Sequence, residues 1–442
     1  MNISLLLEPI NIMKIFEMEH IFALPLETMT SVVEKSINIK ISHATDIGGG
    51  RENQDDFFIF QKPEEKITVV AILDGHGIEN GKLASKCARD FLTTYFETNY
   101  LLLKTNPYET LVHAYSEMHN NLRECFKQSL TNNDYKVMET RDGYLLKRYT
   151  DNHQWQSLRG GTTCTIIAII DNMLYSSNVG DSTATLCSKM RIFNPEKQLT
   201  YLGDSATPSS RPFKQKVSRE TSESEESEES TLSTTMDIIA NHSPDNPSEF
   251  CRLRQFQQRL GNPLQPASHL VYDSQLNDKV RCAPIFTVDD AGNPTVTNNG
   301  TYCKNVRYEL ATLVTTPSSA RFSESLAFTR SIGDFYMQTY GVTYCPEIQC
   351  LDLDILFDVL DTKKQEQKTP LCLVVASDGV WDNWKFEDVT DFVLSDTVLE
   401  SSTKKEKTAA ELLIQQNDVF AKANFGNNSD NATAIVVYLD RE

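Results

Sequence analysis

The chain lacks several features that mark common classes of protein. Its ten cysteines include no C-x-x-C pair, so the sequence indicates neither a zinc knuckle nor a dithiol redox centre. No run approaches the ~18 uninterrupted apolar residues of a membrane-spanning helix. Positive charge is also scarce, with 42 Lys and Arg against 61 Asp and Glu, and the net charge of −19 repels nucleic acids and anionic lipid surfaces. We therefore expect neither nucleic acid nor a membrane as a partner. We interpret the cysteines as reduced thiols of a cytoplasmic or nuclear protein rather than as a disulfide framework.

The N-terminal segment is apolar but does not have the order of a secretory signal. It lacks a basic start, and Glu8, Lys14, Glu17 and Glu19 interrupt its apolar part. We interpret residues 1–37 as an extension that packs on the domain edge as a helix or stays partly mobile, and residues 38–440 as the main domain.

Strands and helices are predicted from two kinds of apolar pattern. Short, continuous runs rich in β-branched residues suit strands of sheets that are covered on both faces; they occur at 67–73, 163–170, 173–179, 371–377 and 432–439. Longer segments with apolar residues three and four apart predict helices; they occur at 81–98, 106–130, 386–395 and 408–425. Helices that cover the faces of sheets give a layered arrangement.

Other stretches do not fit this pattern. From 200 to 322 the sequence is rich in Ser, Thr, Asn, Pro and Gln, which predicts a long insertion within the main domain. Within it, SRETSESEESEES (218–230) has six glutamates, one arginine and no apolar residue, so we expect it to be disordered. We also expect 361–369 and 400–407 to be exposed loops.

Acidic residues stand at the ends of the predicted strands. Asp74 follows the first run in DGHG, Asp378 follows another in SDGVWD, and Asp430 precedes the last in SDNAT. A further pair, Asp55 and Asp56, precedes a strand in RENQDD. Carboxylates that converge without cysteine form an oxygen-rich site, which favours magnesium or manganese over zinc. Any one of these motifs alone is better explained as a turn or a helix cap.

Together, however, the motifs form an ordered series. RENQDD, DGHG, GGTTCT, NVGDS, LAFTRSIGD, SDGVWD and SDNAT occur in this order, and the series resembles the metal-dependent serine/threonine protein phosphatases of type 2C. The resemblance covers roughly residues 38–440, apart from 200–322. It implies an α+β fold, a four-layer sandwich of two antiparallel β-sheets flanked by helices.

The resemblance also implies roles for individual residues. Two Mn²⁺ or Mg²⁺ ions would be held by Asp55, Asp74, the Gly75 carbonyl, Asp378 and Asp430, while Asp181 and Asp378 would hold a weaker third ion. Asn431 would support the loop beside Asp430. Arg51 would grip the substrate phosphate, and His76 would act as the general acid.

Chemistry explains why such residues are needed. A phosphate monoester hydrolyses very slowly, and two divalent ions can activate water and stabilise the phosphoryl charge. The leaving alkoxide needs a proton, which a histidine can donate, and an arginine fork fits two phosphate oxygens.

We therefore predict a monomeric enzyme that hydrolyses phosphoserine and phosphothreonine on protein substrates. Two alternatives stay open: a catalytically inactive member that acts as a binding or scaffold module, and a phosphatase for small molecules. The segment 240–254 resembles the start of a helix found before the substrate-facing flap in this family, whereas the rest of the insertion has no counterpart there.

Overall fold

The computed structural model describes residues 36–149, 154–203, 232–259, 268–274, 276–362 and 370–441. The predicted N-terminal extension up to residue 35, the acidic segment 218–230 and most of the predicted loop 361–369 lie outside these residues. All ten cysteines lie within them and are free thiols. Among the described helices, none combines the length and the apolar character needed to cross a bilayer.

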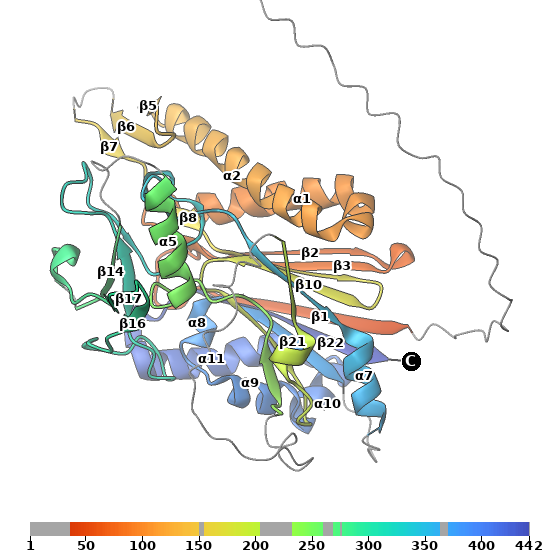
Figure 1. Cartoon of the computed structure of the whole chain (residues 1–442). Helices are drawn as coiled ribbons and strands as arrows, with labels where there is room; N and C mark the ends of the chain where they lie inside the picture. Colours follow the sequence, from red (N-terminus) through yellow and green to blue (C-terminus); the bar gives the residue numbers. More distant parts are fainter. Residues whose placement is uncertain are drawn as a thin grey trace, which may run out of the picture. The chain divides into compact units, whose positions relative to one another are not determined.

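Two antiparallel sheets form the centre of the fold (Figure 1). The six-stranded sheet has the order β12 (Thr200–Leu202), β20 (Glu347–Asp352), β10 (Met173–Val179), β9 (Cys164–Ile170), β3 (Ile67–Leu73) and β2 (Asp56–Lys62). The five-stranded sheet has the order β1 (Ile37–Asp46), β22 (Ala432–Arg441), β21 (Leu371–Ala376), β11 (Thr183–Cys187) and β13 (Thr235–Asp237). The strands predicted at 67–73, 163–170, 173–179, 371–377 and 432–439 are confirmed, with small differences at their ends.

Alternation along each central strand explains why these runs are apolar throughout. In β3, Val69 and Ala71 belong to a hydrophobic cluster between this sheet and the helices of residues 81–132, whereas Val70 and Ile72 face the space between the two sheets. Successive side chains of a strand point to opposite faces, so a sheet buried on both faces needs an apolar residue at every position. β21 and β22 alternate in the same way between the inter-sheet cluster and a third cluster under the C-terminal helices.

Helices cover the outer face of each sheet. α1 (Gly81–Thr105) and α2 (Pro107–Asn132) cover the six-stranded sheet, and α8 (Asp378–Trp381), α9 (Phe386–Val393), α10 (Asp396–Lys404) and α11 (Ala409–Phe425) cover the five-stranded sheet (Figure 1). α11 begins with a capping box in which Thr408 and Glu411 satisfy each other's backbone N–H groups. Three hydrophobic clusters thus separate four layers, which confirms the predicted α+β sandwich.

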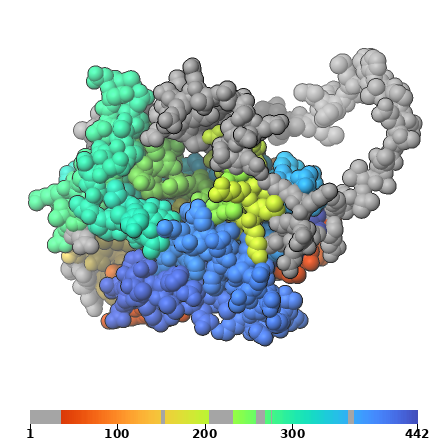
Figure 2. Space-filling view, turned by 90° about the horizontal axis from the view of Figure 1, so that it is seen from below, coloured from red at the N-terminus to blue at the C-terminus, as the bar shows by residue number. Residues whose placement is uncertain are grey.

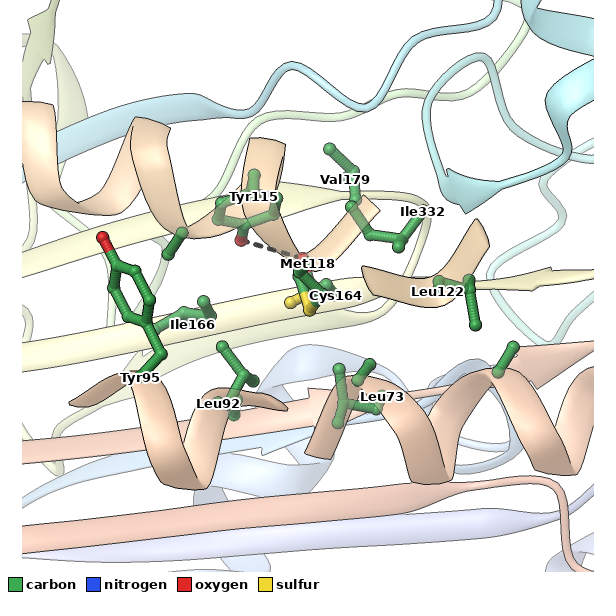
Figure 3. Packing of buried hydrophobic residues seen from close by; sticks show 14 of the residues in the cluster. Leu73, Leu92, Tyr95, Tyr115, Met118, Leu122, Cys164, Ile166, Val179 and Ile332 are labelled. Carbon is green, nitrogen blue, oxygen red and sulfur yellow. Dashed lines mark hydrogen bonds between the residues drawn. The ribbon is translucent and has the colours of Figure 1, made fainter. Parts of the chain in front are cut away.

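Figure 3 shows the cluster between α1, α2 and the six-stranded sheet. Leu92 of α1 and Met118 and Leu122 of α2 are fully buried against strand residues that include Leu73 and Ile166. The Tyr115 hydroxyl is buried among them, and its single hydrogen is shared between the backbone oxygens of Cys164 at 3.1 Å and Ser177 at 2.8 Å. A polar group inside the core is therefore paired, as burial requires.

The smaller elements lie mainly around one end of the sandwich. They form three-stranded sheets from β4 (Gly75–His76), β8 (Gly161–Thr162) and β19 (Ile332–Gly333), from β5 (Tyr135–Glu139), β6 (Leu145–Tyr149) and β7 (Gln156–Ser157), and from β14 (His269–Tyr272), β17 (Thr312–Thr315) and β18 (Ser325–Leu326). A two-stranded sheet joins β15 (Phe286–Val288) and β16 (Pro294–Val296), and the remaining helices are α3 (Pro195–Gln198), α5 (Pro247–Arg259), α6 (Phe335–Gln338) and α7 (Leu353–Thr362). Short 3₁₀ turns are η1 (Pro63–Glu65), η2 (Lys279–Arg281) and η3 (Gly426–Asn428).

The range 200–322 contributes to the sandwich as well as extending from it. β12 is an edge strand of the six-stranded sheet, and β13 is an edge strand of the other, with Met236 and Ile238 buried between the sheets. Further along, Tyr272, Ile285 and Phe286 form a small cluster of their own, against which Phe250 of α5 packs. Sparse apolar patterning therefore reflects short strands and a small separate core.

One loop prediction is wrong. Residues 400–404, which we expected in an exposed loop, form the last half of α10. The polar sequence misleads because only one residue of this helix, Val398, is buried, while the Ser395 side chain caps its start. Residues 361 and 362 of the other predicted loop end α7.

Candidate metal and phosphate site

Antiparallel pairing brings the acidic strand ends together at one end of the sandwich. The β2–β3 register pairs Asp56 with Leu73, so Asp55 lies one residue before β2 and Asp74 one residue after β3 at the same end. In the other sheet, Ala376 at the end of β21 pairs with Ala434 of β22, so Asp378 and Asp430 also share an end. Neighbouring strands of an antiparallel sheet run in opposite directions, so one end of the sheet holds the start of one strand and the end of the next. Acidic residues that precede a strand therefore lie at the same end as acidic residues that follow a strand.

A serine joins the two sheets at this end. The Ser377 hydroxyl donates a 2.7 Å hydrogen bond to Asp55 Oδ2 and accepts a 3.0 Å bond from the backbone N–H of Thr433. Asp74 is fixed similarly, because its backbone N–H donates to Thr163 Oγ1 at 3.0 Å and its carbonyl accepts from the Thr163 N–H at 2.8 Å. The carboxylates are therefore held by neighbouring strands rather than by mobile side chains.

The acidic residues perturb one another. Burial raises the pKa of Asp74 well above its usual range, and the charges of Asp55, Asp378 and Asp430 raise that pKa further. Burial, together with Asp181 and Asp430, raises the pKa of Asp378 in the same way. Burial raises the pKa of Asp55 to about 6, although the hydrogen bond from Ser377 opposes the shift. The structure thus brings the five predicted acidic residues close enough for their charges to act on Asp74 and Asp378, and Asp181 and Asp378 line one cavity.

The donor set fits a hard divalent cation. The residues offer carboxylate oxygens, and Asp55 Oδ1 is a buried oxygen without a hydrogen-bond partner among the described residues. A buried, unpaired carboxylate oxygen is costly unless a cation or donor meets it, and oxygen ligands suit Mg²⁺ and Mn²⁺. Within the described part of the chain, no three His, Cys, Asp or Glu side chains are already placed around one point as ligands. Ion binding by this cluster, including the Gly75 carbonyl, thus stays a prediction.

His76 comes two residues after Asp74 in the chain. It pairs with Asp334, to which the sequence alone gave no role. His76 Nε2 lies 2.6 Å from Asp334 Oδ2, and the imidazole packs edge-on against Phe328 with 4.9 Å between ring centroids. Burial alone would lower the pKa of His76, but the carboxylate of Asp334 outweighs it and the net pKa is raised. The imidazole therefore stays protonated to higher pH than a free histidine.

Arg51 lies on the loop that follows β1, and Asn431 holds that loop. Asn431 Oδ1 accepts from the Gln54 N–H at 2.7 Å, and Asn431 Nδ2 donates to the carbonyls of Ile47 at 2.7 Å and Glu52 at 3.2 Å. The Arg51 side chain is exposed and forms no ion pair with another described residue. The loop of residues 47–54 thus carries a guanidinium that is available to an anion. The loop that Asn431 supports by hydrogen bonds is this one.

A cavity of about 230 Å³ lies beside Asp181 and Asp378. Its wall includes Asp181, Asp378 and Asp382, and also Lys304 from the long insertion. Burial lowers the pKa of Lys304, but Asp181, Asp382 and Asp378 raise it more, so the net shift is upward. A cationic side chain from outside the ordered motifs therefore faces the acidic end of the sandwich.

Comparison with known sequences identifies the family. The family model described as protein phosphatase 2C matches residues 44–206 and 311–417, which together make up more than half of the chain. The chain belongs to the protein phosphatase 2C family.

Curated phosphatase 2C relatives are distant. The chain is 22% identical over 368 residues to the rice (Oryza sativa subsp. japonica) protein named "Putative protein phosphatase 2C 76", covering 76% of this chain and 58% of that protein. It is 23% identical over 336 residues to "Putative protein phosphatase 2C 50" of Arabidopsis thaliana, covering 74% and 63%. The chain thus spans less than two thirds of the length of these relatives.

A solved phosphatase 2C structure shares the fold. The serine-threonine phosphatase 2C of Toxoplasma gondii superposes with a TM-score of 0.53 at 13% identity, covering 91% of this chain and 95% of that one. At this identity the likeness concerns the fold alone.

The phosphatase 2C family model leaves residues 207–310 unmatched, and this range contains Lys304. Sequence reasoning missed this residue because a lone lysine in a polar insertion has no distinguishing signal. Asp334 and Asp382 could have been suspected, since both end quoted motifs, LAFTRSIGD and SDGVWD, but nothing in the spacing says which side chain each one meets.

Proposed function

We propose that this protein is a metal-dependent phosphatase that hydrolyses phosphoserine and phosphothreonine on proteins. The observation that carries the proposal is the convergence of Asp55, Asp74, Asp378 and Asp430 from two sheets into one cluster whose members raise one another's pKa. Such a cluster needs positive charge, and family membership supports divalent ions as its source. Mn²⁺ and Mg²⁺ both suit this all-oxygen donor set.

The residues beside the cluster supply what phosphate ester hydrolysis further needs. When bound, two divalent ions would supply an activated water and neutralise phosphoryl charge. Arg51, on the loop whose backbone Asn431 holds, binds phosphate oxygens with its planar fork. His76, kept protonated by Asp334 2.6 Å away, donates a proton from its imidazole to the departing serine or threonine oxygen.

The neighbouring residues Asp55 and Asp56 offer a matched pair of variants. Asp55 is directed into the cluster by Ser377, whereas Asp56 forms ion pairs with Arg89 at 2.9 Å and Lys82 at 3.6 Å. Asp55→Asn should weaken metal binding and lower turnover by orders of magnitude. Asp56→Asn removes the same charge one residue away, and it should reduce stability while leaving metal dependence intact.

The test is hydrolysis of phosphothreonine, phosphotyrosine and sugar phosphate substrates with manganese, magnesium or chelator. The proposal expects metal-dependent release of phosphate from the phosphothreonine peptide, in preference to the other two substrates, and loss of that activity in Asp55→Asn but not in Asp56→Asn. Preference for the sugar phosphate would indicate a small-molecule phosphatase. Binding of phosphopeptide without turnover under any metal condition would indicate a scaffold.

A further inference from the structure

The loop of residues 303–310, within the insertion that the family model leaves out almost entirely, is a compact turn with its own internal bonds. Cys303 pairs with Leu310 as an isolated antiparallel bridge, and the Lys304 N–H donates to the Glu309 carbonyl at 2.7 Å. The Asn305 side-chain oxygen accepts from the backbone N–H groups of Arg307 at 3.0 Å and Glu309 at 3.3 Å. These bonds fix the position of Lys304 at the start of the turn.

The 303–310 loop is anchored to the segment that follows the acidic cluster. Arg307 Nη1 donates to the carbonyls of Trp381 and, at 2.9 Å, Trp384, and its guanidinium lies 4.9 Å from the ring centroid of Phe386. The Val306 N–H donates to the Asp382 carbonyl at 3.2 Å. Figure 2 shows the teal insertion lying against the blue C-terminal part of the chain on this face. The loop is therefore seated on α8, the helix that begins with Asp378.

This anchoring directs Lys304 into the cavity beside the cluster. Asp181, Asp378 and Asp382 share the wall of that cavity with Lys304 and are the acids that act most strongly on it. None of their oxygens lies within 4.0 Å of the ammonium nitrogen, so the amine faces the three acids across the cavity rather than forming a closed ion pair with one of them. Asp237, Asp245, Glu309 and Arg307 also line the cavity, so the Lys304 ammonium group lies in a largely acidic pocket.

We propose that Lys304 supplies the positive charge at Asp181 and Asp378 that a third divalent ion would otherwise bring, so that this chain binds two divalent ions rather than three. The inference rests on the proposed function, because it concerns the number of ions at the same site. A third divalent ion in this cavity would share carboxylates with the ammonium group and be repelled by it at short range. The residues present therefore do not fit a third ion while the 303–310 loop is seated.

Manganese binding by the full-length protein tests this, measured by equilibrium dialysis and elemental analysis. Wild type should bind two ions per chain. Lys304→Gln, which removes the charge but keeps most of the side-chain length, should bind a further ion at least about tenfold more tightly than wild type does. Lys304→Arg keeps the charge and should behave as wild type.

A second variant tests the same point through the anchor. Arg307→Ala removes the contacts to Trp381 and Trp384 and the 2.9 Å ion pair with Glu309, but leaves Asp181, Asp378 and Asp382 in place. Release of the loop should also create the additional ion site. Thermal melting with and without manganese checks that each variant is folded and reports the extra bound ion as a larger metal-induced stabilisation.

These outcomes separate the inference about Lys304 from the proposed phosphatase function. If Lys304→Gln and wild type bind the same number of ions with the same affinities, Lys304 does not occupy the third position, and the inference is overturned while the proposed function stands. If neither protein binds manganese at millimolar concentration, both fail.

Discussion

Exchange of Asp334 for asparagine tests the role of His76 most directly. His76 Nε2 is 2.6 Å from Asp334 Oδ2, and the two side chains are 21% and 4% exposed, so solvent screens their interaction little. Asparagine keeps the shape and removes the charge. It also tolerates the left-handed backbone of residue 334, whose φ is 45°. The variant should therefore fold.

The magnitude follows from the ionic hydrogen bond. Such a bond contributes about 1.5–3 kcal/mol, and ~1.36 kcal/mol corresponds to one pKa unit. Loss of the Asp334 charge should therefore lower the pKa of His76 by roughly one to two units, and burial, which disfavours the imidazolium, is then unopposed. A general acid works in its protonated form, so activity disappears as pH rises through this pKa. In Asp334→Asn that loss should begin roughly one to two pH units lower.

The assay is the pH dependence of kcat/KM on a phosphothreonine peptide. Ser331→Ala is the control, because the Ser331 hydroxyl donates to the same Asp334 oxygen at 2.6 Å but carries no charge, and it should leave the alkaline limb nearly in place. With p-nitrophenyl phosphate, whose leaving group needs no proton, the limb should be weak or absent. An alkaline limb at the same pH in Asp334→Asn and wild type would refute the reasoning.

Four further outcomes are expected. Asp74→Asn and Asp378→Asn should each lower turnover on a phosphopeptide by orders of magnitude, and titration calorimetry should show weakened manganese binding; full activity in excess chelator would contradict this. Removal of metal should lower the melting temperature of wild type, because repulsion among the clustered carboxylates is then uncompensated; an equal or higher value without metal would argue against the cluster as the binding site. Arg51→Ala should mainly raise KM with metal affinity unchanged, as steady-state kinetics and calorimetry would show; the reverse pattern would make it part of the metal site. Glu249→Gln should destabilise the fold by about 1–3 kcal/mol in urea unfolding at neutral pH, because it removes the ion pair that Glu249 forms with Arg330, 2.5 Å away and 7% exposed, and leaves Arg330 with its second partner Glu347 at 2.7 Å. Burial would raise the pKa of Glu249, but the charge of Arg330 outweighs burial and holds this pKa well below its usual range. The stability that the ion pair contributes is therefore present above the unfolded-state pKa and fades as pH falls through the folded-state pKa. An unchanged urea midpoint at neutral pH would mean that the ion pair is dispensable.

Local sequence was sufficient to predict the layers and the acidic strand ends. Continuous apolar runs rich in β-branched residues, such as 67–73, are typical of a sheet covered on both faces, and helical periodicity at 81–98 and 408–425 predicted the elements that cover it. Asp74 and Asp378 were identifiable because a charged residue directly after a continuous apolar run marks the point where the strand ends. These features depend on neighbouring residues alone, so the sequence determines them without knowledge of the fold.

The polar stretches were harder, because their structure depends on contacts made far along the chain. Residues 400–404 form part of a helix that has a single buried residue, and β13 is recognisable only through its pairing with β11. A short edge strand has too few residues for a period, and it forms because a distant strand offers unpaired backbone groups.

Only the tertiary structure decided which charged groups meet. Asp55 and Asp56 are neighbours of the same type, yet the alternation of the strand turns one toward Ser377 and the other toward Arg89. Asp334 pairs with a histidine 258 positions away, and Lys304 faces Asp181 and Asp378 from an insertion outside the ordered motifs. The sequence determined that carboxylates stand at strand ends, because that follows from local burial. The tertiary structure decided their partners, because electrostatic interactions depend on distance in space rather than on distance along the chain.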